Sequence, residues 1–171
     1  QPMNLAQIFT VLPLIILAAF GMAILLISAF MNDVRKDNTI GYIAFTGIVF
    51  VFLSLFLFVG KGKLTFGAMI SVDAFTLFFY LIFVVIAALT ILASIPYVRI
   101  VGIHSGEYYA LILFAMIGMM LMASSTNLVM LFLSLEMMSI PIYILAGFMK
   151  KNARSTESSL KYFLLGAFSS G

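Results

Sequence analysis

Long uncharged apolar stretches dominate this sequence and limit what it can fold into. A helix of about 20 apolar residues crosses a hydrocarbon core of about 30 Å, and the chain has several runs of that length separated by short polar segments. Of its 171 residues, 64% are hydrophobic and only 9% are charged, whereas globular domains average about a quarter charged residues. The sequence therefore predicts an all-α, polytopic transmembrane helix bundle.

The charged and polar segments mark where each predicted helix ends. Pro96 is expected to mark the end of the third helix, and the cluster Ser124–Asn127 divides the long run after it into two. Asp73 is a predicted cap for the free N–H groups of the third helix. We expect helices over about 8–31, 40–60, 71–97, 107–123 and 127–149, and a sixth from near Ser155. Gly118, Gly147 and Gly166 are small enough to permit close helix contacts.

Lysine and arginine are unevenly distributed between the two predicted sides. Loops with more of these residues stay in the cytoplasm, which predicts that the N-terminus lies outside. One side holds Arg35, Lys36, Arg99, Lys150, Lys151 and Arg154, and the other holds Lys61 and Lys63. Tyr42, Tyr97, Tyr108 and Tyr109 fall at predicted cytoplasmic helix ends, as expected for an aromatic belt.

The composition also excludes several kinds of chemistry. Without cysteine there is no iron–sulfur or zinc–thiolate site, and the one histidine, His104, cannot supply bis-histidine haem ligation. His104 is expected to be a solvated loop residue. No glycine-rich nucleotide-binding motif occurs. The net charge of +3 is confined to short loops, so it indicates membrane topology rather than nucleic-acid binding, and any redox chemistry must come from a partner.

Glu136 is the most informative charge in the chain. It follows the Asn127 turn by nine residues, which at 1.5 Å per residue places it roughly 14 Å deep, near the midplane. A charge there costs at least ~2.5–3.5 kcal/mol and needs a partner, water or a proton. Ser139 shares its face, and Pro141 disturbs the backbone turn at Met137. This group is expected to hold water around a carboxyl that exchanges protons; the alternative is an acid that only holds helices together.

Lys161 is the second candidate, about six residues into the sixth helix. It has a simpler interpretation as well. Glu157 precedes it by one turn, in the favourable order for an i,i+4 ion pair at the helix surface. A lysine can also extend its ammonium group towards the membrane interface. The residues alone leave both interpretations open.

Several strings in the second half of the chain resemble subunit N of bacterial respiratory complex I, the proton-pumping NADH:quinone oxidoreductase. The two most specific are LEMMSIPIYILAGF at 135–148 and ESSLKYFLLGAFSS at 157–170. Shorter matches occur at 107–111 and 118–124, and the DAFTLFF start of the third helix at 73–79 is similar too. Residues 1–70 match only as hydrophobic helices.

The resemblance implies a larger architecture. Subunits of this family have about fourteen helices, with inverted five-helix repeats that begin at the fourth helix. Residues 1–106 would then hold the first three transmembrane helices, and residues 107–171 the start of the first antiporter-like repeat. Gln1 and the unfinished sixth helix led us to expect the N-terminal part of a longer, antiporter-like subunit.

By the same resemblance, Glu136 matches the glutamate of the fifth helix that pairs with a lysine of the seventh, and Lys161 matches a sixth-helix lysine near the proton path. The implied function is proton translocation as the non-redox subunit of the enzyme, a translocase driven by quinone reduction elsewhere. The two alternatives are a cation/proton antiporter subunit of the Mrp type and a structural membrane subunit without its own proton path.

The resemblance also implies which molecules surround the chain. No cofactor is expected in this chain, and NADH, FMN, iron–sulfur clusters and quinone are expected on partner subunits. The expected partners are the antiporter-like M subunit, small K- and J-type subunits, and the lipid bilayer. The implied location is the bacterial inner membrane.

Overall fold

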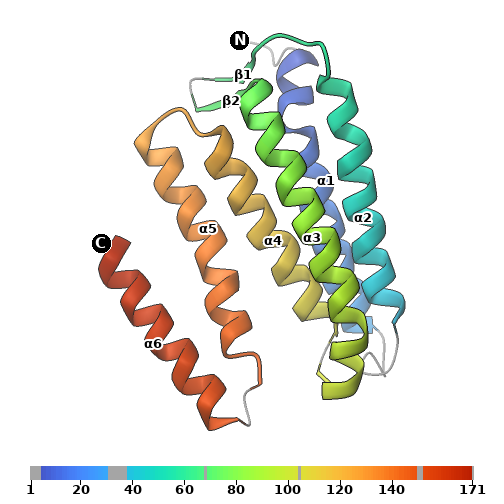
Figure 1. Ribbon diagram of the computed structural model, residues 1–171, viewed down its shortest axis with the longest axis vertical. Helices are drawn as coiled ribbons and strands as arrows, with labels where there is room; N and C mark the ends of the chain where they lie inside the picture. Colours follow the sequence, from blue (N-terminus) through green and yellow to red (C-terminus); the bar gives the residue numbers. More distant parts are fainter. Residues whose placement is uncertain (1–4, 31–37, 68, 104, 150–151, 171) are drawn as a thin grey trace.

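The computed structural model describes residues 5–30, 38–67, 69–103, 105–149 and 152–170. Long helices dominate it, and a small hairpin lies at one end (Figure 1). The helices are α1 (Leu5–Phe30), α2 (Thr39–Leu55), α3 (Ala74–Val101), α4 (Ser105–Ser124), α5 (Leu128–Ala146) and α6 (Ala153–Ser170). A 3₁₀ turn, η1 (Phe56–Phe58), extends α2, and the two strands are β1 (Leu64–Phe66) and β2 (Ile70–Val72).

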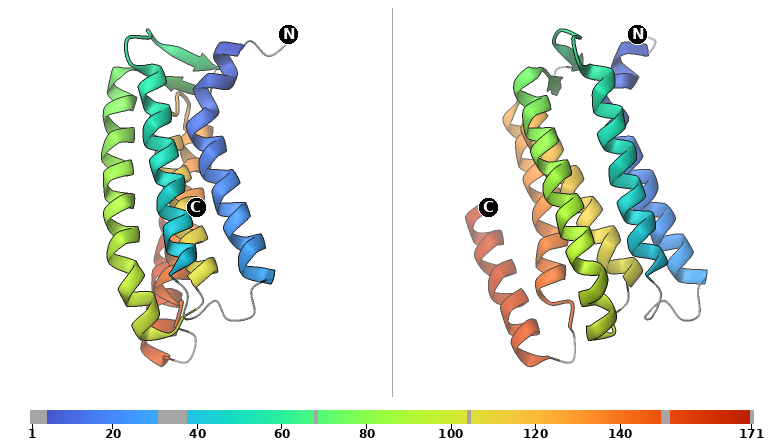
Figure 2. Two further views of the ribbon diagram at one scale, coloured as in Figure 1. Left: turned by 90° about the vertical axis from the view of Figure 1, so that its right-hand side faces the viewer. Right: turned by 45° about the vertical axis from the view of Figure 1, so that its right-hand side comes forward.

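The first five helices are long and apolar enough to cross a bilayer. They run roughly up and down beside one another (Figure 2). The chain is therefore a multi-pass membrane protein, as its uncharged runs predicted. The sixth helix has a polar first half and is not among these candidate spans.

Helix α4 forms the centre of the bundle. It packs against α1, α2, α3 and α5, and more of its span is buried than of any other span. The interior is filled by large apolar side chains from four helices, including Leu17, Ile24, Ile48, Val51, Tyr80, Ile91, Leu113, Met116 and Met120. Helices α5 and α6 lie to one side of this core (Figure 1), with α6 packed on α5.

The hairpin of β1 and β2 covers one end of the bundle and was not predicted. Leu64 pairs with Val72 and Phe66 with Ile70 in antiparallel register. The backbone of Ile70 also bridges to Ser125, and the Thr126 N–H donates to the Met69 carbonyl at 3.0 Å. The hairpin therefore joins the start of α3 to the turn between α4 and α5. Strands of three residues are too short for a clear alternating pattern.

The predicted end of α3 was wrong. The helix continues through Pro96 to Val101 and stops at Gly102, whose φ of +69° is left-handed and whose N–H donates to the Val98 carbonyl at 3.0 Å. A proline inside a helix removes one hydrogen bond, but a left-handed residue after the last turn ends it. The loop predicted from 99 to 107 is correspondingly short, because α4 begins at Ser105.

The ends of α5 and α6 also differ from the prediction. Helix α5 stops at Ala146, three residues early, and α6 begins at Ala153. The predicted N-cap, Ser155, lies inside α6, and its hydroxyl donates to the Ala146 carbonyl at 2.8 Å. Asn152 occupies the capping position instead, since its Oδ1 accepts from the Arg154 N–H at 3.0 Å.

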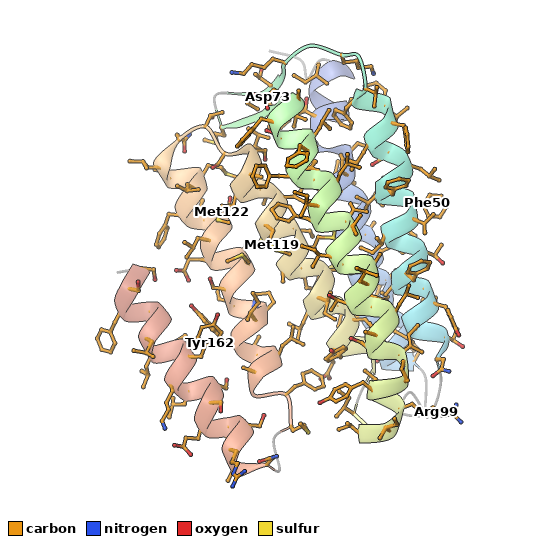
Figure 3. All side chains as sticks on the ribbon, in the orientation of Figure 1. Phe50, Asp73, Arg99, Met119, Met122 and Tyr162 are labelled. Carbon is orange, nitrogen blue, oxygen red and sulfur yellow. The ribbon has the colours of Figure 1, made fainter. Side chains whose placement is uncertain are left out.

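The two ends of the bundle carry different polar groups. Asp73 lies at the hairpin end and Arg99 at the opposite end (Figure 3). The predicted tyrosine belt is only partly correct, because Tyr42 and Tyr97 are exposed whereas Tyr109 belongs to the buried core. Four residues of the topology argument lie outside the described residues, namely Arg35, Lys36, Lys150 and Lys151, and so does His104, the expected loop residue.

Candidate functional site

Glu136 lies at the middle of α5. It is the ninth of the nineteen residues of that helix, and α5 is long and apolar enough to span a bilayer. Its side chain is half-buried at the margin of the bundle. This position agrees with the depth predicted from the Asn127 turn. The turn itself is fixed by Asn127, whose Oδ1 accepts from the Met130 N–H at 2.7 Å and so caps α5.

No hydrogen bond or ion pair joins the Glu136 carboxylate to any residue that the structure describes. On the outer side of α5 its neighbours are apolar, and Leu133, Met137 and Ile140 are each exposed by more than a third. An acid that holds helices together needs a donor on a neighbouring helix. The described part of the chain offers Glu136 none.

The backbone beside Glu136 is pressed against α4. A Cβ atom added to Gly118 would lie 2.6 Å from the Met138 Cα and 2.8 Å from the Met137 carbonyl carbon. Real Cβ atoms essentially never come so close to another backbone. The predicted close contact at Gly118 is therefore confirmed, and it occurs one residue after Glu136. The absence of a side chain at Gly118 fixes how near α5 lies to the centre of the bundle.

Two serines of α5 turn into the bundle on either side of the acid. Ser134 is fully buried, and its hydroxyl donates to the Met130 carbonyl of the same helix at 2.6 Å. Ser139 is 8% exposed. Helix α5 continues through the buried Pro141 without ending. The proline and both hydroxyls thus lie within a turn or two of Glu136, but more deeply buried than the acid.

Lys161 is paired with Glu157 and not with Glu136. Its Nζ lies 2.5 Å from the Glu157 Oε1, and the two side chains are 69% and 63% exposed. This is the i,i+4 pair on the helix surface that the sequence left open as the simpler interpretation. The structure therefore does not bring the two candidate residues together.

The contact between α5 and α6 explains that separation. The ring of Tyr143 packs against those of Tyr162 and Phe163, at centroid distances of 4.9 and 5.9 Å. Tyr143 is seven residues, or roughly 10 Å along the helix, from Glu136. Since Lys161 precedes Tyr162 in the antiparallel helix, it lies at the level of Tyr143, about two turns away from the acid.

The corner between α5 and α6 is held by hydroxyls and glycines. The Ser159 hydroxyl donates to the Tyr143 carbonyl at 2.7 Å. A Cβ on Gly147 would lie 2.6 Å from the Ser159 Cβ, and one on Gly166 would lie 2.6 Å from the Tyr143 Cζ. Both glycines therefore permit close helix contacts, as predicted.

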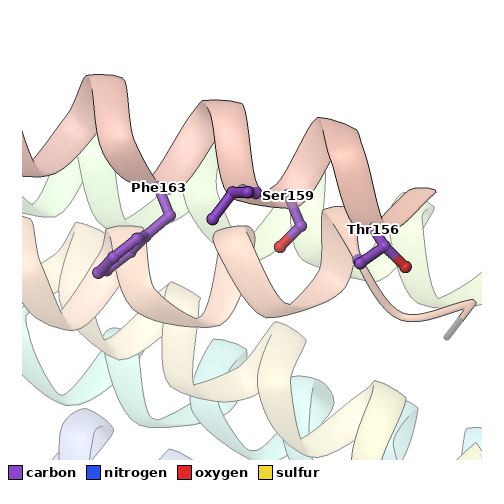
Figure 4. Close-up of a pocket in the computed structure, with 5 residues that line it drawn as sticks. Thr156, Ser159 and Phe163 are labelled. Carbon is purple, nitrogen blue, oxygen red and sulfur yellow. The ribbon is translucent and has the colours of Figure 1, made fainter. Parts of the chain in front are cut away.

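A shallow pocket opens at this corner (Figure 4). Its volume is about 360 Å³, and its lining consists of Gly147, Thr156, Ser159, Leu160 and Phe163. Neither Glu136 nor Lys161 belongs to that lining. The pocket and the intramembrane acid are thus separate features of the same helix pair.

Sequence reasoning missed one polar cluster, at the hairpin end of α3 and α4. Tyr80 and Ser71 are buried there with hydroxyls that have no hydrogen-bond partner among the described residues. Tyr80 lies on the buried face of α3, and hydrophobic patterns do not distinguish a buried tyrosine from phenylalanine. The sequence predicted a helix from residue 71, whereas the structure places Ser71 in β2, next to the turn that follows α4.

Asp73 is the helix cap that the sequence predicted. Its Oδ1 accepts from the Thr76 N–H at 2.9 Å, and its backbone is extended with φ of −129°. The hydrogen bond from the Thr76 N–H is the main cause that holds the pKa of Asp73 below 3.8, with a further contribution from the nearby Lys63.

One part of the chain matches a known family model. Residues 125–171 match the transmembrane family described as NADH:quinone oxidoreductase/Mrp antiporter. This segment contains α5 and α6, and therefore both Glu136 and Lys161.

Individual relatives match nearly the whole chain. NADH-quinone oxidoreductase subunit N of Trichlorobacter lovleyi is 40% identical over 98% of this chain and 36% of its own length. F(420)H(2) dehydrogenase subunit N of Methanosarcina mazei is 38% identical over 95% of this chain and 34% of its own length. The chain thus spans about a third of the length of the curated relatives it matches.

A solved structure shares the fold as well. A chain of respiratory complex I from Thermus thermophilus with bound aureothin superposes with a TM-score of 0.74 and 32% sequence identity. The match covers 92% of this chain and 34% of that one. The arrangement of helices described above is therefore similar to that of part of a chain of respiratory complex I.

Proposed function

Since this chain is a relative of subunit N of NADH-quinone oxidoreductase over nearly its whole length, we propose that it acts in a proton-translocating membrane subunit of a complex I-type enzyme. The observation that carries the proposal is Glu136, an acid at the middle of a membrane span without a partner among the described residues. Such acids mark proton or ion pathways. The family match over 125–171 includes it.

Glu136 would work by changing its affinity for a proton. A carboxyl surrounded by hydrocarbon binds its proton tightly, and water or a nearby cation weakens that affinity. The Glu136 side chain is half-buried at the margin of the bundle, which leaves one side of it open to water or a cation. Redox energy released elsewhere in the enzyme would alter the hydration or the cation distance at Glu136 and so load and release a proton.

Lys161 takes a secondary place in this proposal. Its pair with Glu157 occupies its ammonium group at the helix surface, two turns away from Glu136. We assign it a role near the proton path and not as the direct partner of the acid. The partner proposed for Glu136 is the lysine of the seventh helix that the resemblance implies.

The remaining chemistry belongs to other subunits. In the proposal this chain binds no cofactor, and the electron donor, FMN, iron–sulfur clusters and quinone are held by its partners, among them antiporter-like M and small K- and J-type subunits. One relative belongs to an F(420)H(2) dehydrogenase and another to an NADH-quinone oxidoreductase. This supports a membrane subunit whose role does not depend on which electron donor is oxidised.

We further propose a location in the bacterial inner membrane with the N-terminus outside. The hairpin end, with Lys61 and Lys63, would face outwards. The opposite end, where α3 finishes near Arg99 and α6 begins near Arg154, would face the cytoplasm. The supporting principle is that lysine and arginine accumulate in cytoplasmic loops.

The two alternative functions each predict a different observation. An Mrp-type antiporter subunit agrees with the family description, but the relatives named above are dehydrogenase subunits. A purely structural subunit would need Glu136 to bond a neighbouring helix, and no described residue provides that bond. Both observations favour proton translocation driven by electron transfer.

Replacement of Glu136 by Gln tests the proposal in the assembled enzyme. Glu136→Gln keeps the shape and removes the charge, so the complex should assemble and proton pumping per electron should fall sharply. Glu107→Gln is the matched control, because Glu107 is exposed in the first turn of α4 and should leave pumping unchanged. Normal pumping by an assembled Glu136→Gln enzyme would support the structural alternative, and sodium efflux in place of proton pumping would support the Mrp alternative.

A further inference from the structure

A cluster of polar side chains lies beneath the hairpin, where β2, the start of α3 and the end of α4 meet. Thr76 and Tyr80 occupy one face of α3, one helical turn apart. Ser71 comes from β2 and Ser124 from the last turn of α4. All four are buried, with Tyr80 fully inaccessible and Ser71 only 7% exposed.

Two hydroxyls of this cluster are left without hydrogen bonds. The Tyr80 hydroxyl and the Ser71 Oγ have no partner among the described residues. Ser124 is the side chain that interacts with the Tyr80 hydroxyl, but the two groups do not meet hydrogen-bond geometry. A buried hydroxyl without a partner is costly, and it usually indicates a bound water or ion.

The bonds that do form in this cluster are long. The Thr76 hydroxyl lies 3.1 Å from the Asp73 Oδ1, 3.3 Å from the Ser71 carbonyl and 3.4 Å from the Ala123 carbonyl. Hydroxyl hydrogen bonds are typically about 2.5–3.0 Å long. One hydroxyl can donate to only one of these acceptors at a time, so acceptor oxygens remain for another donor.

Other serines in the membrane spans form shorter hydrogen bonds. The hydroxyls of Ser54, Ser94 and Ser134 each donate to a carbonyl of their own helix at 2.6 Å. The hydroxyls of the cluster beneath the hairpin are therefore less well bonded than those of these three serines.

We propose that the hydroxyls of Ser71, Tyr80 and Ser124 bind an internal water molecule between β2, α3 and α4. A buried water needs two to four polar partners. Tyr80 and Ser71 supply donors, Ser124 supplies lone pairs because its own proton goes to the Met120 carbonyl at 3.0 Å, and the Ala123 carbonyl lies at the same junction. The water satisfies groups that the protein leaves unpaired.

This site extends a polar column inwards from Asp73. Asp73 caps α3 at the hairpin end, Thr76 bonds to it, and Tyr80 lies one turn further along the same face. Tyr80 is seven residues from Asp73, roughly 10 Å along the helix. The column hydrates the contact of α3 with α4 and is separate from Glu136, which lies beside the contact of α4 with α5. It does not rest on the function proposed above.

The test is a density map of the intact complex, purified from membranes, at a resolution that shows ordered water. We expect a water peak within hydrogen-bonding distance of the Tyr80 hydroxyl. Tyr80→Phe and Ser71→Ala should each weaken or remove the peak. The control is Tyr108→Phe, because the Tyr108 hydroxyl already bonds the Ser94 Oγ at 3.1 Å, and it should keep the peak. A dry, well-resolved site in the wild-type complex overturns the proposal.

Thermal stability gives a second and independent measurement. If water joins these hydroxyls, Tyr80→Phe removes satisfied hydrogen bonds and should lower the melting temperature, as we also expect of Tyr108→Phe, which removes the bond to Ser94. If the site is dry, Tyr80→Phe removes an unpaired buried hydroxyl and should leave the melting temperature unchanged or raise it. The second result contradicts the proposal. Should Tyr80→Phe fail to assemble, the wild-type map and Ser71→Ala still decide the question.

Discussion

Single polar side chains determine where the apolar helices of this protein begin. Asp73 and Asn127 each accept a hydrogen bond from the N–H three residues later, at 2.9 and 2.7 Å. Apolar runs alone cannot fix a start, because the same hydrophobic residues fit several registers. A side-chain cap selects one of them.

The Asp73 cap should be visible in stability measurements. Asp73→Ala removes the bond to the Thr76 N–H and is expected to cost about 0.5–2 kcal/mol, whereas Asp73→Asn can still cap the helix and should cost less. Thermal unfolding of the purified complex measures both. Equal stability of Asp73→Ala and wild type would show that the cap contributes nothing.

The cap also has a defined pH dependence. The pKa of Asp73 is lowered below 3.8 in the folded chain, chiefly by the Thr76 N–H. A lowered carboxyl pKa stabilises the folded state above the unfolded pKa, and that contribution is lost as the pH falls through the folded pKa. The stability difference between wild type and Asp73→Asn should therefore shrink on acidification below about pH 4. A difference that grows on acidification would contradict this sign.

The pair of Lys161 and Glu157 should contribute little to stability. Both side chains are largely exposed, and exposed pairs are worth about 0–1 kcal/mol. Lys161→Gln is therefore expected to leave the melting temperature nearly unchanged, with Lys61→Gln as a control at the opposite end of the bundle. A large loss of stability on Lys161→Gln would mean that the lysine has a buried partner.

At the scale of helices, the contact of α4 with α5 depends on one missing side chain. Gly118→Ala would place a Cβ against the backbone of Met137 and Met138, and a helix backbone cannot move aside as a side chain can. We expect a loss of about 1–3 kcal/mol in stability and a displacement of Glu136 that reduces pumping. Thermal unfolding and proton pumping of the assembled complex measure these two effects.

Gly62→Ala is the matched control for that prediction, since nothing lies within 4 Å of a Cβ at Gly62. It should leave both stability and pumping unchanged. A Gly118→Ala complex as stable as the Gly62→Ala complex would show that α4 and α5 are not held in close contact.

The sequence predicted the helices whose ends are marked by charged residues or by a change in hydropathy. The five spans and the position of Glu136 within α5 followed from where charges stop. The end of α3 did not, because Pro96 was expected to end the helix, whereas the left-handed Gly102 ends it. The hairpin was missed because each strand has only three residues. Its absence from the prediction also concealed the cluster of Ser71 and Tyr80.

At the scale of the whole molecule, the two ends of the bundle should face different compartments. None of the 171 residues is cysteine, so a single introduced cysteine is the one thiol of this segment and can be labelled there. Lys61→Cys at the hairpin end should react with a membrane-impermeant thiol reagent added to intact cells. Arg99→Cys at the opposite end should react only in inverted vesicles. Both residues are exposed, and the reverse labelling pattern would overturn the proposed orientation.

The similarity to complex I subunits and the position of Glu136 support different parts of the proposed function. The relatives establish what kind of membrane subunit this chain is similar to over nearly its whole length. Glu136 lies at the middle of α5 without a partner among the residues that the structure describes, and this supplies the physical reason to expect proton exchange. The sequence did not identify the cation that pairs with Glu136, because Lys161 forms its ion pair with Glu157.

The most direct test is whether Glu136 changes its protonation while the enzyme turns over. Infrared difference spectra of the assembled complex, recorded with and without electron transfer, report this through the carbonyl stretch of a protonated carboxyl group. We predict a carboxyl band that changes with turnover, is absent from Glu136→Gln and persists in Glu107→Gln. Identical wild-type and Glu136→Gln spectra in the carboxyl region would show that Glu136 exchanges no proton.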